Sequence, residues 1–460
     1  MIYRDPRRVH FVGIGGAGMS GLAEILVSLG HHVSGCDQAE SDSTRRLAKI
    51  GAPITVGHDA AHVDGQDFLV ATAAIPADST EIAEARRRKI PVVRRAELLG
   101  ELMRVREGIA IAGTHGKTTT TSMTGLLLTE AGLDPTVVVG GRIHLWGAGA
   151  RLGKGEFLVA EADEYDRSFL CLQPALSVIT NIEADHLDCY SGLDDIRDTF
   201  VQFAHRTSAF GAVIACIDDA GVQEILPRID RPIVTYGFGP HSDIRAVDER
   251  INPEGSVAAR VVERGTVLGE ISLRLPGRHN LQNALAAVTV ARQIAIPFDV
   301  VQRALGSFTG VVRRFERKGE RNGVLVIDDY AHHPTEVAAT LDAARHSFPE
   351  RRIVALFQPH LYSRTRDFAR EFGRSFLGAD RLAVTEIYAA REAPIDGVSG
   401  RLVAEAASLS GHREVEFLED RPAVDFFLGT KLEAGDVLLT LGAGDIYRAG
   451  ERFLAGEVAP

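Results

Sequence analysis

Two glycine-rich segments of this sequence have the residue types and spacing that bind phosphate groups. The first, Gly13-Ile-Gly-Gly-Ala-Gly18, follows a short apolar run and opens a helical pattern, as the motif G-x-G-x-x-G does. Its glycines permit a tight turn and close backbone approach, so a pyrophosphate can rest at a helix N-terminus. Asp37, after the next apolar run, is placed to accept a hydrogen bond from a ribose hydroxyl. The segment predicts a nucleotide diphosphate site that does not require a nicotinamide; a purely structural turn is the alternative.

The second segment, Gly113-Thr-His-Gly-Lys-Thr-Thr119, again lies between an apolar run and a helical pattern. In a phosphate-binding loop, backbone N–H groups surround the phosphates and a lysine such as Lys117 reaches the β and γ oxygens. The next hydroxyl, here Thr118, ligates Mg²⁺. The usual spacing places a glycine at position 111, where this chain has Ile111, so the segment predicts a shorter variant of the loop.

Two acidic clusters each directly follow an apolar, strand-like run: Glu161-Ala-Asp-Glu164 and Asn181-Ile-Glu-Ala-Asp-His186. Open α/β sheets build their sites at the carboxyl ends of strands, so these groups could complete one or two Mg²⁺ sites facing Lys117. For any one of these side chains alone, a helix cap or a surface charge is the plainer interpretation.

Further polar groups follow apolar runs or open helical patterns later in the chain. They are Asn280 and Asn283, Arg313 and Arg314, Asp328-Asp-Tyr-Ala-His-His-Pro334, and Gln358-Pro-His-Leu-Tyr-Ser-Arg-Thr-Arg366. The asparagine amides suit either a helix cap or the edge of an adenine. The arginines could hold carboxylate or phosphate by bidentate bonds, although an isolated Arg-x-Arg is more often a solvated surface.

The elements that position these groups alternate strand, turn and helix in three blocks. The alternation predicts an α/β protein of three domains and, for the first block, a parallel sheet. We predict a Rossmann-like N-terminal domain over 1–105, a central P-loop ATPase-type domain over 106–312, and a C-terminal Rossmann-like α/β domain over 313–460. A basic and polar stretch, 311–322, precedes the third alternation, which opens at 324.

Composition bounds the function. At about 150 residues per domain, 460 residues also predict about three domains. The chain has 51 basic and 62 acidic residues, a net charge of −11, so nucleic acid and anionic membranes are unexpected partners. The four cysteines (Cys36, Cys171, Cys189 and Cys216) include no C-x-x-C pair, which favours free thiols over a disulfide framework or a zinc site. No run approaches the ~20 apolar residues of a membrane span, and the expected location is the cytoplasm.

Taken together, these segments resemble the Mur ligase family over nearly the whole chain. The most specific elements are residues 13–20, 113–119, 161–164 and 181–186, and residues 328–334 and Ala-Arg-Glu-Ala-Pro-Ile at 390–395 resemble its alanine-adding member. The resemblance implies a bacterial, cytoplasmic, ATP-dependent amide ligase. The first domain would bind UDP-N-acetylmuramate, the central domain ATP and two Mg²⁺ ions, and the third L-alanine. The lactyl carboxylate of the sugar would attack the γ-phosphate, and the amine of L-alanine would then displace phosphate from the acyl phosphate.

The resemblance also implies roles residue by residue. Catalytic roles fall on Lys117, His186, Arg314, His332 and Arg364. ATP contacts fall on Gly113, Thr114, His115, Gly116, Lys117, Thr118, Thr119, Asn280, Asn283 and Arg313. Contacts with the UDP-sugar fall on Gly15, Gly16, Gly18, Met19, Ser20, Asp37 and Thr72. The amino-acid side comprises Tyr330, His332, Arg364 and Arg366, and the Mg²⁺ ligands are Thr118, Glu161 and His186.

Three other functions stay open at this point. An NAD-dependent oxidoreductase accounts for residues 13–37 but not for Gly116-Lys-Thr118. A nucleotide-binding regulator without catalysis would use the central loop alone. A recycling ligase that joins a preformed tripeptide to the same UDP-sugar would differ only in its amine pocket. An oligomer is possible, and the sequence does not indicate its size.

Sister ligases carry a carbamylated lysine near the second metal, whereas residues 193–203 contain no lysine, which leaves His186 and its neighbours to bind that ion.

Overall fold

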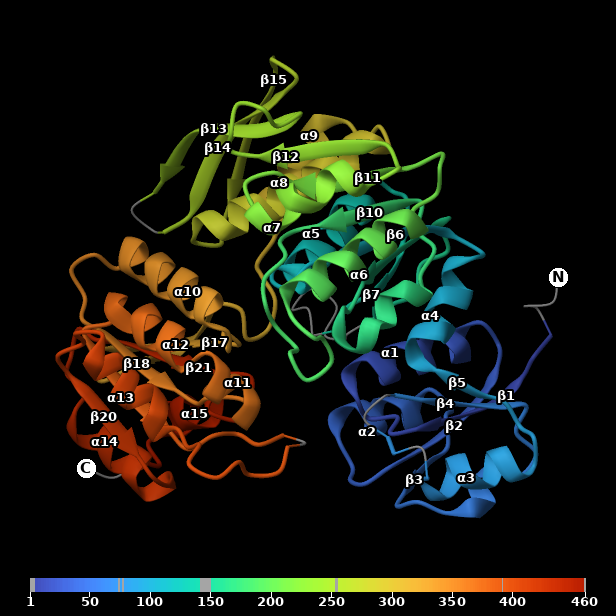
Figure 1. The fold of residues 1–460 in the computed structure, drawn as a ribbon, viewed down its shortest axis with the longest axis horizontal. Helices are drawn as coiled ribbons and strands as arrows, with labels where there is room; N and C mark the ends of the chain where they lie inside the picture. The colour runs from blue at the N-terminus through green and yellow to red at the C-terminus, as the bar shows by residue number, and fades with distance from the viewer. Residues whose placement is uncertain are drawn as a thin grey trace. The chain divides into compact units, whose positions relative to one another are not determined.

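A computed structural model describes residues 5–72, 75–76, 78–140, 150–252, 255–390 and 392–458. The described strands form three sheets, with helices packed against them (Figure 1). The chain divides into two compact units. The first unit is Met1–Val247, Val261–Gly269 and Gln282–Leu305, and the second is Asp248–Arg260, Glu270–Leu281 and Gly306–Pro460. Three sheets with alternating helices confirm the predicted α/β fold class, while the domain bounds at 105 and 312 stay predictions. Arg391, within the 390–395 motif, lies outside the described residues.

The first sheet has five parallel strands in the order β3-β2-β1-β4-β5. Its strands are β1 (Arg8–Val12), β2 (His32–Asp37), β3 (Ile54–Val56), β4 (Phe68–Ala71) and β5 (Val92–Arg94), and its helices are α1 (Ala17–Ser28), α2 (Asp42–Lys49), η2 (Ala60–Val63), α3 (Thr80–Arg87) and α4 (Arg95–Met103). Phe11 and Val12 belong to separate apolar clusters, because a parallel sheet is covered on both faces. The turn from β1 to α1 places Gly13 to Gly18 at the carboxyl edge of the sheet.

The second sheet has ten strands in the order β15-β14-β13-β12-β11-β10-β6-β9-β7-β8. The strands are β6 (Glu107–Ala112), β7 (Thr136–Val138), β8 (Ala150–Arg151), β9 (Phe157–Glu161), β10 (Leu176–Ile179), β11 (Ala212–Cys216), β12 (Ile233–Gly237), β13 (Ile244–Ile251), β14 (Val257–Glu263) and β15 (Thr266–Leu273). The helices are α5 (Lys117–Glu130), η3 (Tyr165–Cys171), α6 (Leu193–Arg206), α7 (Ala220–Ile225), η4 (Leu226–Arg228), α8 (Arg278–Gln293) and α9 (Phe298–Ser307). Strand β6 is parallel to both of its neighbours, β10 and β9, so the segments that follow these three strands meet at one edge.

The third sheet has the order β16-β17-β21-β18-β19-β20. Its strands are β16 (Glu316–Arg321), β17 (Val324–Asp329), β18 (Ile353–Phe357), β19 (Arg381–Thr385), β20 (Val415–Leu418) and β21 (Val437–Leu441). Its helices are α10 (Pro334–Ser347), α11 (Tyr362–Asp367), α12 (Ala369–Ser375), η5 (Phe376–Gly378), α13 (Arg401–Leu409), α14 (Arg421–Thr430) and α15 (Tyr447–Ala455). Much of the polar stretch 311–322 is strand β16, which pairs antiparallel with β17. The charged residues of this segment made it look unlike a strand in the sequence, but a strand at the edge of a sheet tolerates such charges.

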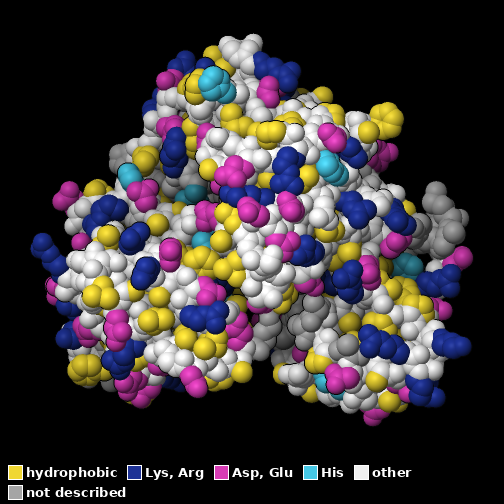
Figure 2. All heavy atoms as spheres, viewed as in Figure 1, with side chains coloured by type: hydrophobic (Ala, Val, Ile, Leu, Met, Phe, Trp, Pro, Cys, Tyr) yellow, Lys and Arg dark blue, Asp and Glu magenta, His cyan; other side chains and the backbone are white. Residues whose placement is uncertain are grey.

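The structure bears on two expectations drawn from the composition, the absence of membrane-spanning helices and the mixed surface charge. Among the described residues, no helix is both long and apolar enough to cross a membrane. On the face drawn in Figure 2, acidic and basic side chains are interspersed, as 62 acidic and 51 basic residues would produce.

Candidate active site

The loop after β6 has a conformation that requires glycine at two positions. Gly113 has a φ of 138° and Gly116 a φ of 81°, both in the left-handed region. A Cβ on Gly113 would lie 1.9 Å from Thr180 Oγ1, and a Cβ on Gly116 would lie 2.4 Å from Asn283 Oδ1. The loop is therefore packed closely against the end of β10 and against α8.

The segment after β10 holds this loop in place. The Thr114 amide donates to the Asn181 carbonyl (3.1 Å), and Thr114 Oγ1 accepts from the Glu183 amide (2.9 Å). The His115 amide donates to Asn181 Oδ1 (2.7 Å), and the His115 carbonyl accepts from Thr180 Oγ1 (2.6 Å). His115 Nε2 lies 3.3 Å from Glu183 Oε2. These bonds set the shape of the loop through its neighbours, as preorganised sites require.

Lys117 lies at the start of α5 with its ammonium turned back toward the loop. Its Nζ donates to the carbonyls of Gly113 (2.6 Å) and Thr114 (3.1 Å) and to Glu164 Oε1 (2.9 Å). Burial lowers the pKa of Lys117, but the surrounding carboxylates, Glu164 foremost, raise it by more. Lys117 is therefore a fixed positive charge, which is what stabilises the charge that develops on a transferring phosphate.

Glu164 connects Lys117 to His186. Its side chain is buried, and burial raises its pKa to about 7 although Lys117 beside it acts in the opposite direction. His186 Nε2 lies 3.6 Å from Glu164 Oε1. The backbone of His186 has a φ of 53°, and its ring meets the edge of Tyr165 at a centroid distance of 5.2 Å. The predicted catalytic pair Lys117 and His186 thus flanks one carboxylate.

Thr118 and Glu161 fit the predicted Mg²⁺ site. Thr118 Oγ1 donates to Glu161 Oε2 at 3.0 Å, and the Gly140 amide donates to the same oxygen at 2.8 Å. Neighbouring oxygen ligands around an octahedral Mg²⁺ lie about 2.9 Å apart, given Mg–O distances of about 2.0–2.1 Å. The hydroxyl and the carboxylate are therefore already at the separation that this ion requires. The next residue, Thr119, is buried.

The two predicted adenine-side asparagines have different surroundings. Asn283 Oδ1 accepts from Thr120 Oγ1 at 3.3 Å and lies against the phosphate loop. Asn280 Nδ2 donates to the carbonyl of Pro276 at 2.7 Å, just before α8 begins. Only Asn283 is thereby placed at the loop by a contact within the first compact unit.

In the first sheet, Asp37 binds the glycine loop itself. Its Oδ2 accepts from the Gly15 amide at 2.7 Å, and the neighbouring carbonyl of Cys36 accepts from the Gly13 amide at 2.9 Å. The sequence pattern pairs Asp37 with a ribose, and the structure gives it a second task, that of fixing the turn.

The other residues predicted at the UDP-sugar surround the start of α1. The Gly16 carbonyl accepts from the amides of Met19 (3.0 Å) and Ser20 (2.9 Å), whose side chains are buried. Gly18 lies within the first turn of α1, and Thr72 directly follows β4. These residues therefore share the carboxyl edge of the first sheet with Gly15.

Arg313 is fully engaged inside the second compact unit. Its Nε donates to Asp328 Oδ2 (2.9 Å), and its two Nη atoms donate to the carbonyls of Gly444 (3.0 Å) and Gly442 (2.6 Å). The guanidinium also lies 4.5 Å from the centroid of the Tyr447 ring. This arginine joins the ends of β17 and β21, and its predicted ATP contact stays a prediction.

Arg314, His332 and Tyr330 form one cluster after β17. Arg314 Nη1 donates to Glu336 Oε1 (3.3 Å), and its guanidinium lies 5.2 Å from the Tyr330 ring centroid. The His332 amide donates to Glu336 Oε2 (3.1 Å), and His332 Nδ1 lies 2.9 Å from the Tyr330 carbonyl. Burial lowers the pKa of Arg314, but Glu336 and other nearby acidic groups raise it by more, so the arginine stays charged.

The two predicted arginines of α11 differ sharply. Arg364 is buried, and its Nη1 lies 3.4 Å from His360 Nδ1. The His360 ring is 5.9 Å from that of His332, which brings Arg364 toward the cluster after β17. Arg366 is 53% exposed and pairs with the adjacent Asp367 at 2.7 Å. The structure brings Arg364 to the other amino-acid-side residues and turns Arg366 to the surface.

Sequence reasoning did not assign the residues that support the loop. Glu164 belongs to the acidic cluster 161–164, and its position after β9 is the sequence signal that points to it. Thr180 and Asn181 directly follow β10, and Asn181 opens the motif 181–186, but the sequence does not indicate that they support the loop, because their partner His115 lies 65 and 66 positions away along the chain.

Largely parallel sheets with glycine loops at their carboxyl edges, one of these loops leading into a lysine that contacts a carboxylate, define a nucleotide-binding α/β enzyme. Three family models match this chain: the Mur ligase family catalytic domain over residues 8–107, the Mur ligase middle domain over 111–291, and the Mur ligase glutamate ligase domain over 313–444. The chain belongs to the Mur ligase family.

Relatives extend the similarity to the full length. The UDP-N-acetylmuramate–L-alanine ligase of Geobacter sulfurreducens is 50% identical over 99% of this chain and 98% of its own. The ligase of the same name from Salinibacter ruber is 51% identical over 97% of this chain and 94% of its own. Among solved structures, the UDP-N-acetylmuramate–alanine ligase of Thermotoga maritima has a TM-score of 0.83 and 31% identity, covering 98% of this chain and 99% of its own.

Proposed function

We propose that this chain is an ATP-dependent ligase that joins L-alanine to the lactyl carboxylate of UDP-N-acetylmuramate in peptidoglycan precursor synthesis. The proposal is carried by Lys117, held between its own loop and Glu164 at the carboxyl ends of β6 and β9. This site stands in a chain that matches ligases of that name over 99% of its length.

Phosphoryl transfer to the lactyl carboxylate depends on positioning and charge more than on covalent chemistry from the protein. The amides of the loop 113–117 would surround the phosphates, and Lys117 Nζ would move from Glu164 to the phosphate oxygens. Burial raises the pKa of Glu164, so this carboxyl group can take up a proton when Lys117 leaves it, which lowers the electrostatic cost of that exchange. The deprotonated amine of L-alanine would then attack the carbonyl carbon of the acyl phosphate, forming the amide C–N bond, breaking the C–O bond to phosphate, and releasing inorganic phosphate and a proton.

Two Mg²⁺ ions are part of the proposal. Thr118 and Glu161 would hold one ion, and His186, with Glu164 beside it, would serve the second. Mg²⁺ supplies positive charge to the phosphate oxygens. Thr118 and Glu161 must each give up their mutual hydrogen bond to bind it, and their 3.0 Å separation means that neither has far to move.

The second compact unit would supply the groups for the later step. Arg314 is assigned to the transferring phosphate, and His332, Tyr330 and Arg364 to the acyl phosphate and L-alanine. A buried arginine such as Arg364 suits the carboxylate of an amino acid, because its planar guanidinium group binds carboxylates in a bidentate manner.

The cytoplasmic location also stays a prediction.

The recycling ligase is the nearest alternative. Among solved structures, a murein peptide ligase from Psychrobacter arcticus has a TM-score of 0.72 and 25% identity, both lower than the 0.83 and 31% of the T. maritima alanine ligase. An oxidoreductase leaves Lys117 and its carboxylates without a task.

The test is ADP release from ATP and Mg²⁺ with UDP-N-acetylmuramate, comparing L-alanine, the tripeptide L-Ala-γ-D-Glu-meso-diaminopimelate and no amine. We expect turnover only with the UDP-sugar and L-alanine together. Turnover with the tripeptide alone would establish the recycling ligase, and no turnover with either amine would favour a binding protein.

A further inference from the structure

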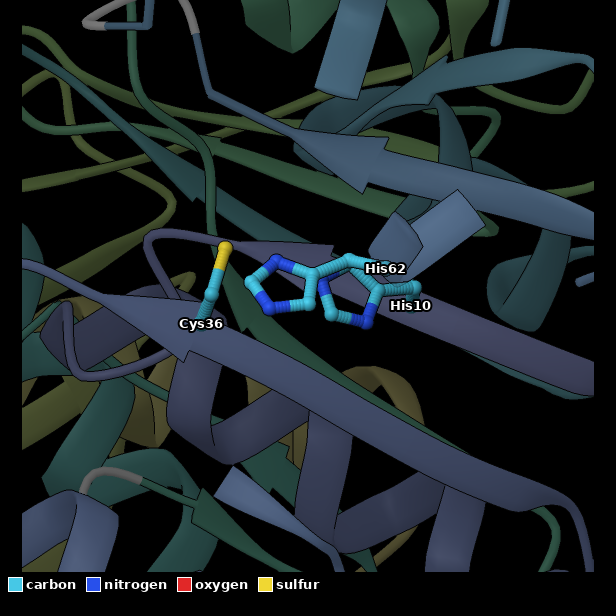
Figure 3. A group of neighbouring side chains, drawn as sticks. All are labelled: His10, Cys36 and His62. Atoms are coloured by element: carbon cyan, nitrogen blue, oxygen red, sulfur yellow. The ribbon is translucent and has the colours of Figure 1, made fainter. Parts of the chain in front are cut away.

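A cluster of side chains on the η2 and α3 side of the first sheet has no task in the proposed reaction. We call it the Cys36 cluster: His10 on β1, Cys36 on β2, His58 after β3, His62 on η2 and Glu81 on α3. Figure 3 shows the Cys36 sulfur beside the rings of His62 and His10. His10, Cys36 and Glu81 are buried, whereas the His58 side chain is 29% exposed and opens the cluster to solvent.

Most of the contacts within the cluster involve a single atom, the carboxylate oxygen Oε1 of Glu81. Glu81 Oε1 is approached by His58 Nδ1 (3.0 Å), His62 Nδ1 (3.2 Å), Cys36 Sγ (3.3 Å) and the amide of Asp59 (3.2 Å). The other oxygen, Glu81 Oε2, is buried with no hydrogen-bond partner among the described residues. The carboxylate therefore uses one oxygen for all of these contacts, although both of its oxygens can accept hydrogen bonds.

The separations match those of ligands around a single tetrahedral ion. With Zn–S of about 2.3 Å and Zn–N and Zn–O of about 2.0–2.2 Å, a tetrahedron places S and N about 3.6 Å apart, S and O about 3.5 Å apart, and N and O about 3.3 Å apart. Here Cys36 Sγ lies 3.6 Å from His58 Nδ1 and 3.3 Å from Glu81 Oε1, and the latter two atoms lie 3.0 Å apart. Three donors of the right chemistry are therefore close to ligand positions.

A second, independent feature points to a ligand. His10 is 2% exposed and its Nδ1 lies 2.9 Å from Ser34 Oγ, while its Nε2 is buried with no hydrogen-bond partner among the described residues. One ring nitrogen held by a neighbour and the other left over is the usual arrangement of a metal-binding histidine. The His10 ring stacks on His62 at 5.2 Å, and both offer a ring nitrogen within 4.8 Å of Cys36 Sγ.

We propose that the Cys36 cluster binds one divalent transition-metal cation of the zinc class, with Cys36, His58 and Glu81 as three ligands and a fourth from the stacked pair His10 and His62. The thiol of Cys36 loses its proton to solvent when the ion binds. The carbonyl of Cys36 accepts from the Gly13 amide, so the ion would also stiffen the start of the first glycine loop.

Cobalt substitution tests the proposal without reference to turnover. The full chain, stripped with a chelator and kept reduced in buffer with excess Mg²⁺, is titrated with Co²⁺ and then with Zn²⁺. We expect a thiolate-to-cobalt charge-transfer band that saturates at one equivalent and is abolished by Zn²⁺. Cys36→Ser should abolish the band. Cys189→Ser, beside His186, and Cys216→Ser, an equally buried cysteine of the second sheet, should keep it.

Absence of the band in the wild-type chain, or a band that survives Cys36→Ser and disappears with Cys189→Ser, would overturn the proposal. If circular dichroism shows that Cys36→Ser is unfolded, His58→Gln and Glu81→Gln replace it. Each should weaken Zn²⁺ binding at least about tenfold in competition with a chromophoric chelator. Unchanged affinity in both would equally refute the site. Of His10→Gln and His62→Gln, the one that weakens binding identifies the fourth ligand, and an effect of neither contradicts the four-ligand arrangement.

Discussion

The side chain of Lys117 keeps its positive charge although it is only 14% exposed. Removing its charge should therefore affect catalysis more than any exposed lysine does. We expect Lys117→Met to lower kcat/KM for ADP release by at least about 10²-fold, the usual effect of losing one preorganised charge donor. Lys154→Met, at an exposed lysine of the same compact unit, should stay within about twofold. Equal losses in both variants would remove Lys117 from the mechanism.

Glu164 predicts a pH dependence of stability. Its folded pKa of about 7 lies above the ordinary 4.5, so the folded chain holds this proton more tightly than the unfolded chain. The associated stability is fully present below about pH 4.5 and is lost as pH rises through 7. The total is on the order of 3 kcal/mol at most. Between pH 5 and 8 the Tm of the wild type should fall by a few °C relative to Glu164→Gln. Parallel Tm curves for the two proteins would show that Glu164 does not titrate there.

At the scale of elements, the β6–α5 loop depends on backbone conformations that its neighbours make irreplaceable. Gly116 and Gly132 have similar φ values, 81° and 76°, but only Gly116 has an atom, Asn283 Oδ1, where a Cβ would go. Gly132→Ala should cost about 1–2 kcal/mol from left-handed backbone alone.

Gly116→Ala adds a steric conflict to the same strain. We expect it to weaken ATP binding at least tenfold by calorimetry, whereas Gly132→Ala leaves binding unchanged. If both variants bind ATP like the wild type, the contact with Asn283 does not limit the shape of the loop.

At the scale of the whole molecule, the residues assigned to one reaction belong to two compact units. Lys117 lies in the first and Arg314 in the second. We expect Arg314→Ala to reduce turnover at least about 10²-fold, because it removes positive charge from the transferring phosphate. Its affinity for ATP should stay within about twofold, since the phosphate loop is complete without it.

Arg401→Ala is the matched control, because Arg401 is 53% exposed in the same unit and pairs with Glu419 at 2.9 Å. It should change neither turnover nor affinity. A parallel loss of ATP affinity and turnover in Arg314→Ala would instead assign that arginine to ground-state binding.

The sequence alone determined the features that depend on local pattern. Apolar runs followed by Gly13 and Gly113 predicted strand, turn and helix correctly, because strand burial and glycine turns are written in consecutive residues. The same patterns also indicated the protein family and the α/β fold class. The sequence pattern did not predict strand β16, because a strand at the edge of a sheet need not be apolar.

Tertiary structure decided which distant groups meet. Lys117 and Glu164 are 47 positions apart, and Cys36 and Glu81 are 45 apart, so neither pairing is a matter of spacing. The absence of a C-x-x-C pair favoured free thiols over a zinc site, yet the parallel strand order brings the side chains of the Cys36 cluster together from β1, β2, η2, α3 and the segment after β3. The spacing of residues along the sequence indicates only local backbone structure. A site that is assembled across a sheet depends on the order of the strands, and that order is set by the packing of the whole sheet.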